Sequence, residues 1–92
     1  MALHIVNRSP YRSSALRDCL NTMAEGDALL LIEDGVYAAS ASAQAGAMPA
    51  GTYCLGADAD ARGVSVSDAI ARIDDARWVA LCVEHTPVVS WF

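Results

Sequence analysis

An apolar strand, an amphipathic helix and a second, fully apolar strand follow one another in the first third of this chain, in the segment LHIVNRSPYRSSALRDCLNTMAEGDALLLIEDGVYAA. The second strand, residues 28–32, is an unbroken apolar run, as expected for a central parallel strand covered on both faces. The order strand, helix, strand is typical of parallel α/β sheets. We therefore predict a three-layer α/β/α fold with a mostly parallel sheet of about five strands.

The first helix is predicted from a stripe of apolar residues at i, i+3, i+4 and i+7, namely Leu16, Cys19, Leu20 and Met23. Either Ser9 or Ser13 is expected to cap its start, because a serine hydroxyl can accept from a free amide, and Pro10 is tolerated in a first turn. Gly26 is placed to end this helix.

The remaining pattern completes a single domain over residues 1–92. A last helix is expected over residues 74–85, with Asp74 or Asp75 as its cap and one face formed by Trp78, Leu81, Cys82 and His85. The other expected elements are strands at 2–6, 52–55, 70–73 and 88–91, a helix of small residues over 36–45, a loop over 46–51, and a turn or short helical turn over 58–63 closed by Gly63.

Hydrophobic residues form 54% of the chain, with a mean hydropathy of +0.29, which exceeds the roughly 45–50% of average soluble domains. We therefore expect part of the apolar surface to meet another chain. No stretch approaches the roughly 18 uncharged apolar residues of a membrane span, and no signal-like segment opens the sequence. These features predict a cytoplasmic protein that does not insert into a membrane.

The net charge is −5, from six arginines, no lysine and eleven acidic residues, which argues against direct nucleic-acid binding. Arg8, Arg12 and Arg17 all precede the first acidic residue, Asp18, so the start of the chain is locally basic. These arginines either face an acidic neighbour or are solvated.

Three cysteines without a close pair make a disulfide framework improbable. Cys82 and His85 have a spacing that could share a metal, but no second pair completes a tetrahedral site, so neither metal nor cofactor is expected. Cys19 is the candidate reactive thiol, because nearby arginines could lower its pKa and let it carry a persulfide. A small buried hydrophobic role is the alternative for Cys19, and it is the favoured interpretation for both Cys54 and Cys82.

Glu33 and Asp34 could form a general acid/base pair, or Asp34 could simply cap the next helix. His4 and His85 lack a nucleophile at a recognisable spacing, so both are expected to be hydrogen-bonded structural residues. The aromatic C-terminal tail is hard to bury in so small a domain and is typical of an interface. The candidate partner-contact residues are Val89, Trp91 and Phe92, together with Arg12 and Arg17.

Several segments in order and spacing resemble the TusB/DsrH family of bacterial sulfur-relay subunits: LHIVNRSP, the helix with Leu16, Cys19 and Leu20, GDALLLIEDGVYAA, YCLGADADARG and the terminal VSW. Asp75 is a departure, since the family often has an aromatic residue there. The resemblance implies a DsrEFH-like fold and a heterohexamer with two homologous subunits, TusC/DsrF-like and TusD/DsrE-like, two copies of each.

In the TusBCD form, the resemblance implies that the complex receives persulfide sulfur from a carrier protein and passes it on for 2-thiolation of the tRNA wobble uridine. In the DsrH form it implies a role in sulfur oxidation. The resemblance also implies that the main sulfur-carrying cysteine belongs to another subunit and that this chain is accessory, although some family members have a cysteine at the position that Cys19 matches. The alternatives are a stand-alone enzyme that uses Cys19 or the Glu33/Asp34 pair, and a structural homo-oligomer.

Overall fold

The computed structural model describes residues 1–40 and 48–92, and its centre is a five-stranded sheet in the order β4-β3-β2-β1-β5. Every neighbouring pair of strands is parallel, which confirms the predicted fold class. All five predicted strands are present, at most one residue shorter at each end than expected: β1 (Leu3–Val6), β2 (Ala28–Leu31), β3 (Thr52–Leu55), β4 (Ala71–Ile73) and β5 (Val88–Trp91).

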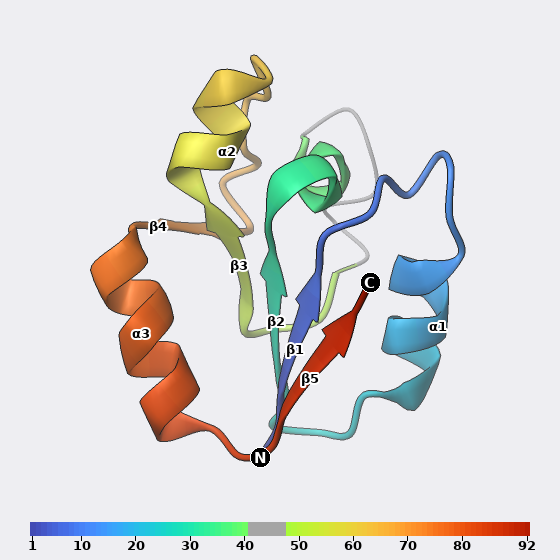
Figure 1. Ribbon diagram of the computed structural model, residues 1–92, viewed down its shortest axis with the longest axis vertical. Coiled ribbons are helices and arrows are strands. Elements are labelled where there is room, and N and C mark those ends of the chain that lie inside the picture. The colour runs from blue at the N-terminus through green and yellow to red at the C-terminus, as the bar shows by residue number, and fades with distance from the viewer. Residues whose placement is uncertain (41–47) are drawn as a thin grey trace.

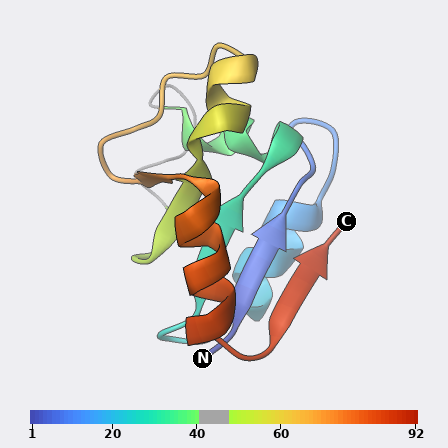
Figure 2. The same ribbon diagram turned by 60° about the vertical axis from the view of Figure 1, so that its left-hand side comes forward.

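The helical segments cover both faces of the sheet: α1 (Ala15–Thr22), the 3-10 helix η1 (Glu33–Ala39), α2 (Gly56–Ala61) and α3 (Asp75–Glu84). The strands β1 to β4 are added in one direction, so right-handed crossovers place α1, η1 and α2 on the same face. The step from β4 to β5 returns past the whole sheet to the far side of β1, which places α3 on the opposite face. Figures 1 and 2 show α1 and α3 on opposite sides of the sheet.

The start of α1 differs from the prediction. A turn occupies the preceding residues, in which the amides of Arg12 and Ser13 both donate to the Ser9 carbonyl. The N-cap is therefore Ser14 rather than Ser9 or Ser13, and Pro10 lies in the turn instead of the helix. Gly26 does not end the helix either: α1 stops at Thr22, and Gly26, with φ of +89°, lies in the turn before β2.

The second helix begins earlier than predicted, directly after β2, as a 3-10 helix. Its N-cap is Ile32, with no side-chain cap, so the prediction that Asp34 caps this helix is wrong. Glu33 enters the turn in the left-handed region, at φ of +48°. Residues 41–45 of the predicted helix, and 46–47 of the predicted loop, lie outside the described residues.

The C-terminal half follows the sequence pattern closely. The Asp74 carboxylate caps α3 by accepting from the Arg77 amide at 2.9 Å, as predicted. His85 follows the helix, and its Nδ1 donates to the Leu81 carbonyl at 2.9 Å, which is the predicted structural role of this histidine. The short helical turn closed by Gly63 is present as α2, although it begins two residues earlier than expected.

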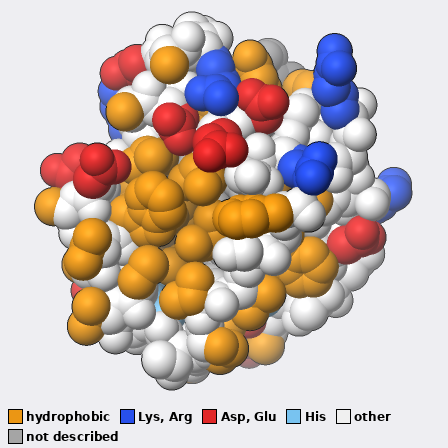
Figure 3. All heavy atoms as spheres, viewed as in Figure 1, with side chains coloured by type: hydrophobic (Ala, Val, Ile, Leu, Met, Phe, Trp, Pro, Cys, Tyr) orange, Lys and Arg blue, Asp and Glu red, His pale blue; other side chains and the backbone are white. Residues whose placement is uncertain are grey.

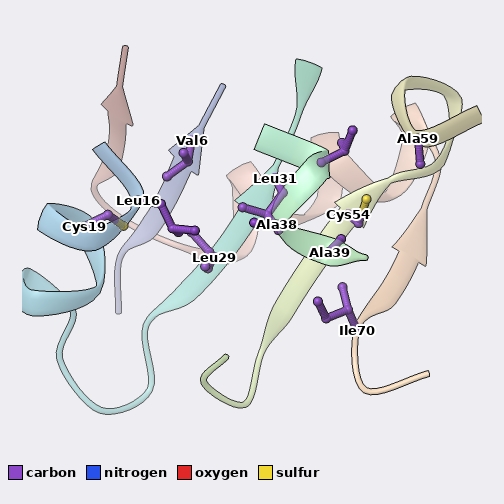
Figure 4. Close-up of a cluster of buried hydrophobic side chains, with 11 residues drawn as sticks. Val6, Leu16, Cys19, Leu29, Leu31, Ala38, Ala39, Cys54, Ala59 and Ile70 are labelled. Carbon is purple, nitrogen blue, oxygen red and sulfur yellow. The ribbon is translucent and has the colours of Figure 1, made fainter. Parts of the chain in front are cut away.

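Two clusters of buried side chains form the core, one on each face of the sheet. The larger one joins α1, η1 and α2 to the sheet and includes Cys19 and Cys54, which Figure 4 shows well apart, on α1 and on β3. On the opposite face, Leu81 is the fully buried residue of α3. No helix within the described ranges is long and apolar enough to cross a membrane.

Candidate functional site

Three side chains far apart in the sequence form a hydrogen-bonded network that runs from the end of β5 through β1 to the turn before β2. Trp91 Nε1 donates to His4 Nδ1 at 3.0 Å, and His4 Nε2 lies 3.0 Å from Asp27 Oδ2. The His4 residue is 4% exposed. Asp27 also accepts from the backbone amides of Ala2 and Ala24, at 2.9 and 3.0 Å. These hydrogen bonds link β5, β1 and the turn before β2.

The hydrogen bonds assign the tautomer of the His4 ring. The Trp91 indole nitrogen can only donate, so His4 Nδ1 must accept and the ring proton is on Nε2, which donates to Asp27. The donors around Asp27, first the Ala2 amide, then the His4 side chain and the Ala24 amide, hold the pKa of its carboxyl well below the usual range. The predicted structural role of His4 is therefore confirmed, and its partners are now known.

Replacing Asp27 with asparagine should lower the melting temperature at neutral pH, because one amide cannot replace a carboxylate that accepts three hydrogen bonds. A lowered folded pKa stabilises the protein fully above the ordinary carboxyl pKa of about 3.9, and this contribution is lost as pH falls towards the folded value. The difference in melting temperature between the wild type and D27N should therefore narrow below about pH 4. The matched control is D18N, and a difference that widens below this pH would contradict the prediction.

The two acidic residues after β2 have separate partners. The Glu33 amide donates to Asp58 Oδ2 at 2.7 Å, and the Glu33 carboxylate accepts from Asn7 Nδ2 at 3.3 Å. Asp34 accepts from Arg62 Nε at 2.9 Å. Among the described residues, no hydrogen bond joins the carboxylates of Glu33 and Asp34. The contacts therefore favour a structural role, in which these residues link the ends of β1 and β2 to α2, over an acid/base pair.

The thiol of Cys19 is fully buried against the core, and burial raises its pKa to about 11, with a smaller effect of Asp27 in the same direction. The expectation of a lowered pKa is therefore wrong: the stripe position turns Cys19 inward, away from the solvated arginines. Cys54 is equally buried, and burial raises its pKa to about 11 as well. Cys82 is half-buried on α3.

Mild alkylation of the folded chain should modify Cys82 first, since its thiol is partly accessible and the other two are buried. Tandem mass spectrometry of tryptic peptides after iodoacetamide treatment measures the order, because Cys19 and Cys54 share the peptide 18–62 and fragmentation is needed to separate them. In urea all three thiols should react at similar rates. Faster reaction of Cys19 than of Cys82 in the folded state would show that α1 opens readily and would contradict this prediction.

Arg12 and Arg17 line a groove of about 540 Å³ between the β1–α1 connection, α1 and the residues that flank the undescribed segment. Both side chains belong to exposed residues. We call this feature the α1 groove. Its lining also includes Tyr11, Leu16 and Met48, so it combines two cations with an apolar floor.

An apolar surface, which we call the α3–β5 surface, lies on the other face. Val79 and Val83 of α3 and Val88 and Phe92 of the C-terminal tail are 64%, 78%, 43% and 65% exposed. Figure 3 shows hydrophobic side chains gathered over α3 and the adjacent sheet. Such exposed apolar residues, when grouped, are typical of surfaces that contact other proteins.

The C-terminal tail is divided between the two faces. Val89 and Trp91 alternate with Val88 and Ser90, and Trp91 packs against the larger core cluster and binds His4. The expectation that both tail aromatics await a partner is therefore wrong for Trp91, which is half-buried within the chain itself. Phe92 stays exposed, as predicted.

Sequence reasoning missed Asp27 and the pair Val79 and Val83. Asp27 lies in a turn, and nothing in its local pattern indicates that a buried histidine and two amides converge on it. The two valines could have been recognised from the sequence as an exposed apolar pair. They lie four residues apart on the predicted helix and outside the face formed by Trp78 and Leu81.

The comparisons with known proteins agree with this architecture. The family model described as "DsrH like protein" matches residues 8–88. Protein TusB from Pectobacterium parmentieri is 38% identical over 95 aligned positions, which cover 97% of this chain and 99% of the relative. Protein TusB from Klebsiella pneumoniae strain 342 and from Escherichia fergusonii are 34% and 36% identical with the same coverage.

A solved structure is also similar: the solution NMR structure of protein Tm0979 from Thermotoga maritima. It superimposes with a TM-score of 0.67 at 25% identity, over 91% of this chain and 93% of that chain. Fold and surfaces thus define a small, all-parallel α/β/α protein with apolar and basic surfaces suited to protein contacts. The chain belongs to the DsrH family, and this membership supports a role as a sulfur-relay subunit.

Proposed function

We propose that this chain is an accessory subunit of a cytoplasmic sulfur-relay complex that passes persulfide sulfur towards 2-thiolation of the tRNA wobble uridine. The observation that carries the proposal is the match to the DsrH family over residues 8–88, together with TusB relatives aligned over 97% of the chain. The partners are two homologous subunits, TusC/DsrF-like and TusD/DsrE-like, in a heterohexamer that receives sulfur from a carrier protein. The chain itself binds neither tRNA nor membrane.

The burial of Cys19 supports an accessory role. A persulfide carrier needs an accessible thiolate, whereas Cys19 is fully buried with a pKa of about 11. The sulfur-carrying cysteine then belongs to a partner subunit. Cys19 can carry sulfur as an additional thiol only if contact with a partner shifts α1 and exposes the Cys19 side chain.

The contacts with the sister subunits use the exposed tail residue Phe92 and the exposed valines of the α3–β5 surface, with Val89 and Trp91 at the margin. Apolar residues of this kind form the centres of stable subunit interfaces. Arg12 and Arg17 provide a second contact region on the other side of the molecule, and this region is basic where the α3–β5 surface is apolar.

The experiment is complementation in a bacterial strain that lacks its own TusB, with the two sister subunits co-expressed. Wild-type chain should co-purify with both subunits and restore 2-thiouridine in the tRNA, as measured by mass spectrometry of nucleosides. C19S should do the same if the chain is accessory. Loss of thiolation with intact assembly of C19S would assign sulfur transfer to Cys19.

Two other results would redirect the proposal. Assembly without restored thiolation would favour the sulfur-oxidation role of the DsrH form. Failure to co-purify with either subunit, with a stable homo-oligomer or monomer instead, would overturn the proposal and favour a structural homo-oligomer or a stand-alone enzyme.

A further inference from the structure

The arginines of the α1 groove have no ion-pair partner in the part of the chain that the structure describes. There the arginine ion pairs belong to Arg62, Arg72 and Arg77, which pair with Asp34, Asp60 and Glu84. Arg12 and Arg17 are exposed, and no acidic residue lines the groove among residues 1–40 and 48–92. The two guanidinium groups are therefore free to bind an anionic group.

Among the described residues, the nearest acidic residue in the sequence forms no ion pair with Arg12 or Arg17 and lies outside the groove lining. Asp18 follows Arg17, but its carboxylate accepts from the Ser14 hydroxyl at 3.0 Å and is absent from the groove lining. Ser14 forms no side-chain cap of α1, and the Ser13 hydroxyl accepts from the Ala15 amide at 3.1 Å, so the positive charge at this end comes from the two arginines.

The floor of the groove is apolar. Leu16 is 7% exposed, and Leu20 and Met48 pack against the larger core cluster from its edge. A volume of about 540 Å³ lies within the usual range of ligand sites, roughly 300–1,000 Å³. A small inorganic anion would leave this floor uncovered, whereas a ligand with both an apolar and an anionic part would use the whole groove.

The rest of the molecule selects against other anions. All eleven acidic residues lie at or after Asp18 in the sequence, and the net charge is −5. A long polyanion such as RNA would therefore be repelled by the surface outside the groove. A short acidic segment of a protein touches only the basic region. Complementary charge also accelerates such an encounter and fixes its orientation.

We infer that the α1 groove binds an acidic peptide segment of a partner protein, with one apolar side chain on Leu16, Leu20 and Met48 and carboxylates paired with Arg12 and Arg17. This inference deepens the proposed function, and rests on it only in taking the partner to be a protein of the same complex. The two can fail separately, because groove binding is measured on this chain alone and sulfur transfer in the assembled complex.

The experiment uses fluorescein-labelled synthetic peptides and the full 92-residue chain, with binding followed by fluorescence anisotropy. Each peptide carries one leucine among aspartates and glutamates, and the panel varies the spacing between the leucine and the carboxylates. We expect at least one spacing to bind, and the affinity to fall with added salt. R12A and R17A should each weaken that binding about tenfold, as expected for a lost charge-assisted contact.

Three controls make the result decisive. R8A removes an arginine of the same connection outside the groove lining and should bind the peptide like the wild type. A peptide with asparagine and glutamine in place of its acids should bind weakly, and so should one with glycine in place of leucine. The inference is overturned if no acidic peptide exceeds its neutral counterpart, if R12A and R17A bind normally, or if inorganic sulfate or tRNA displaces the peptide at lower concentration than unlabelled peptide does.

Discussion

Replacing Gly35 with alanine should destabilise the fold by at least about 3 kcal/mol, enough to unfold much of so small a domain. A Cβ built on Gly35 would lie 2.3 Å from the Val6 carbonyl oxygen and 3.1 Å from its carbon. These are backbone atoms of a central strand, and the same carbonyl accepts from the Ile32 amide at 3.1 Å. Neither η1 nor β1 can move aside without breaking this contact. Urea denaturation followed by circular dichroism measures the loss.

Gly63→Ala is the matched control. Gly63 has a φ of +65°, but no atom lies within 4 Å of its added Cβ, so the cost is only the left-handed backbone, about 1 kcal/mol. A G35A protein as stable as G63A would show that η1 packs less closely against β1 than the structure indicates.

Trp91→Ala should lower the free energy of unfolding by about 3 kcal/mol. The indole packs against the larger core cluster and donates to His4, so its removal leaves a void and an unpaired buried nitrogen on His4 Nδ1. Trp91→Phe keeps the apolar ring but lacks the donor, and should lose less, about 1–2 kcal/mol. Thermal melting of the isolated chain measures both.

Phe92→Ala gives the contrast within the same tail. Phe92 is 65% exposed, so its removal should leave the melting temperature of the isolated chain almost unchanged. Co-purification with the sister subunits should weaken instead, since an exposed aromatic residue at an interface contributes through a partner. If W91A melted like the wild type while F92A lowered the melting temperature, the division of the tail between core and interface would be reversed.

The successes of the sequence analysis have a common origin in local pattern. The apolar run of β2 predicted a central buried strand because every residue of a parallel strand under two helical layers must be apolar. Asp74 predicted the start of α3 because a carboxylate two or three residues before free amides can accept from them. The start of α1 was misplaced, since three nearby serines offer the same hydroxyl and only the Ser9 turn selects Ser14.

The sequence by itself determined the fold class and the five strands, because these follow from periodicities of two and 3.6 residues along the chain. Its composition, with no lysine and no closely spaced pair of cysteines, also argued against lysine chemistry and a disulfide framework. Only the tertiary structure decided what each polar or reactive group does. The return of β5 to the side of β1 brings Trp91 to His4, and the packing of α1 on the sheet buries Cys19 and raises its pKa. These properties depend on contacts between residues far apart in the chain, which a local pattern does not encode.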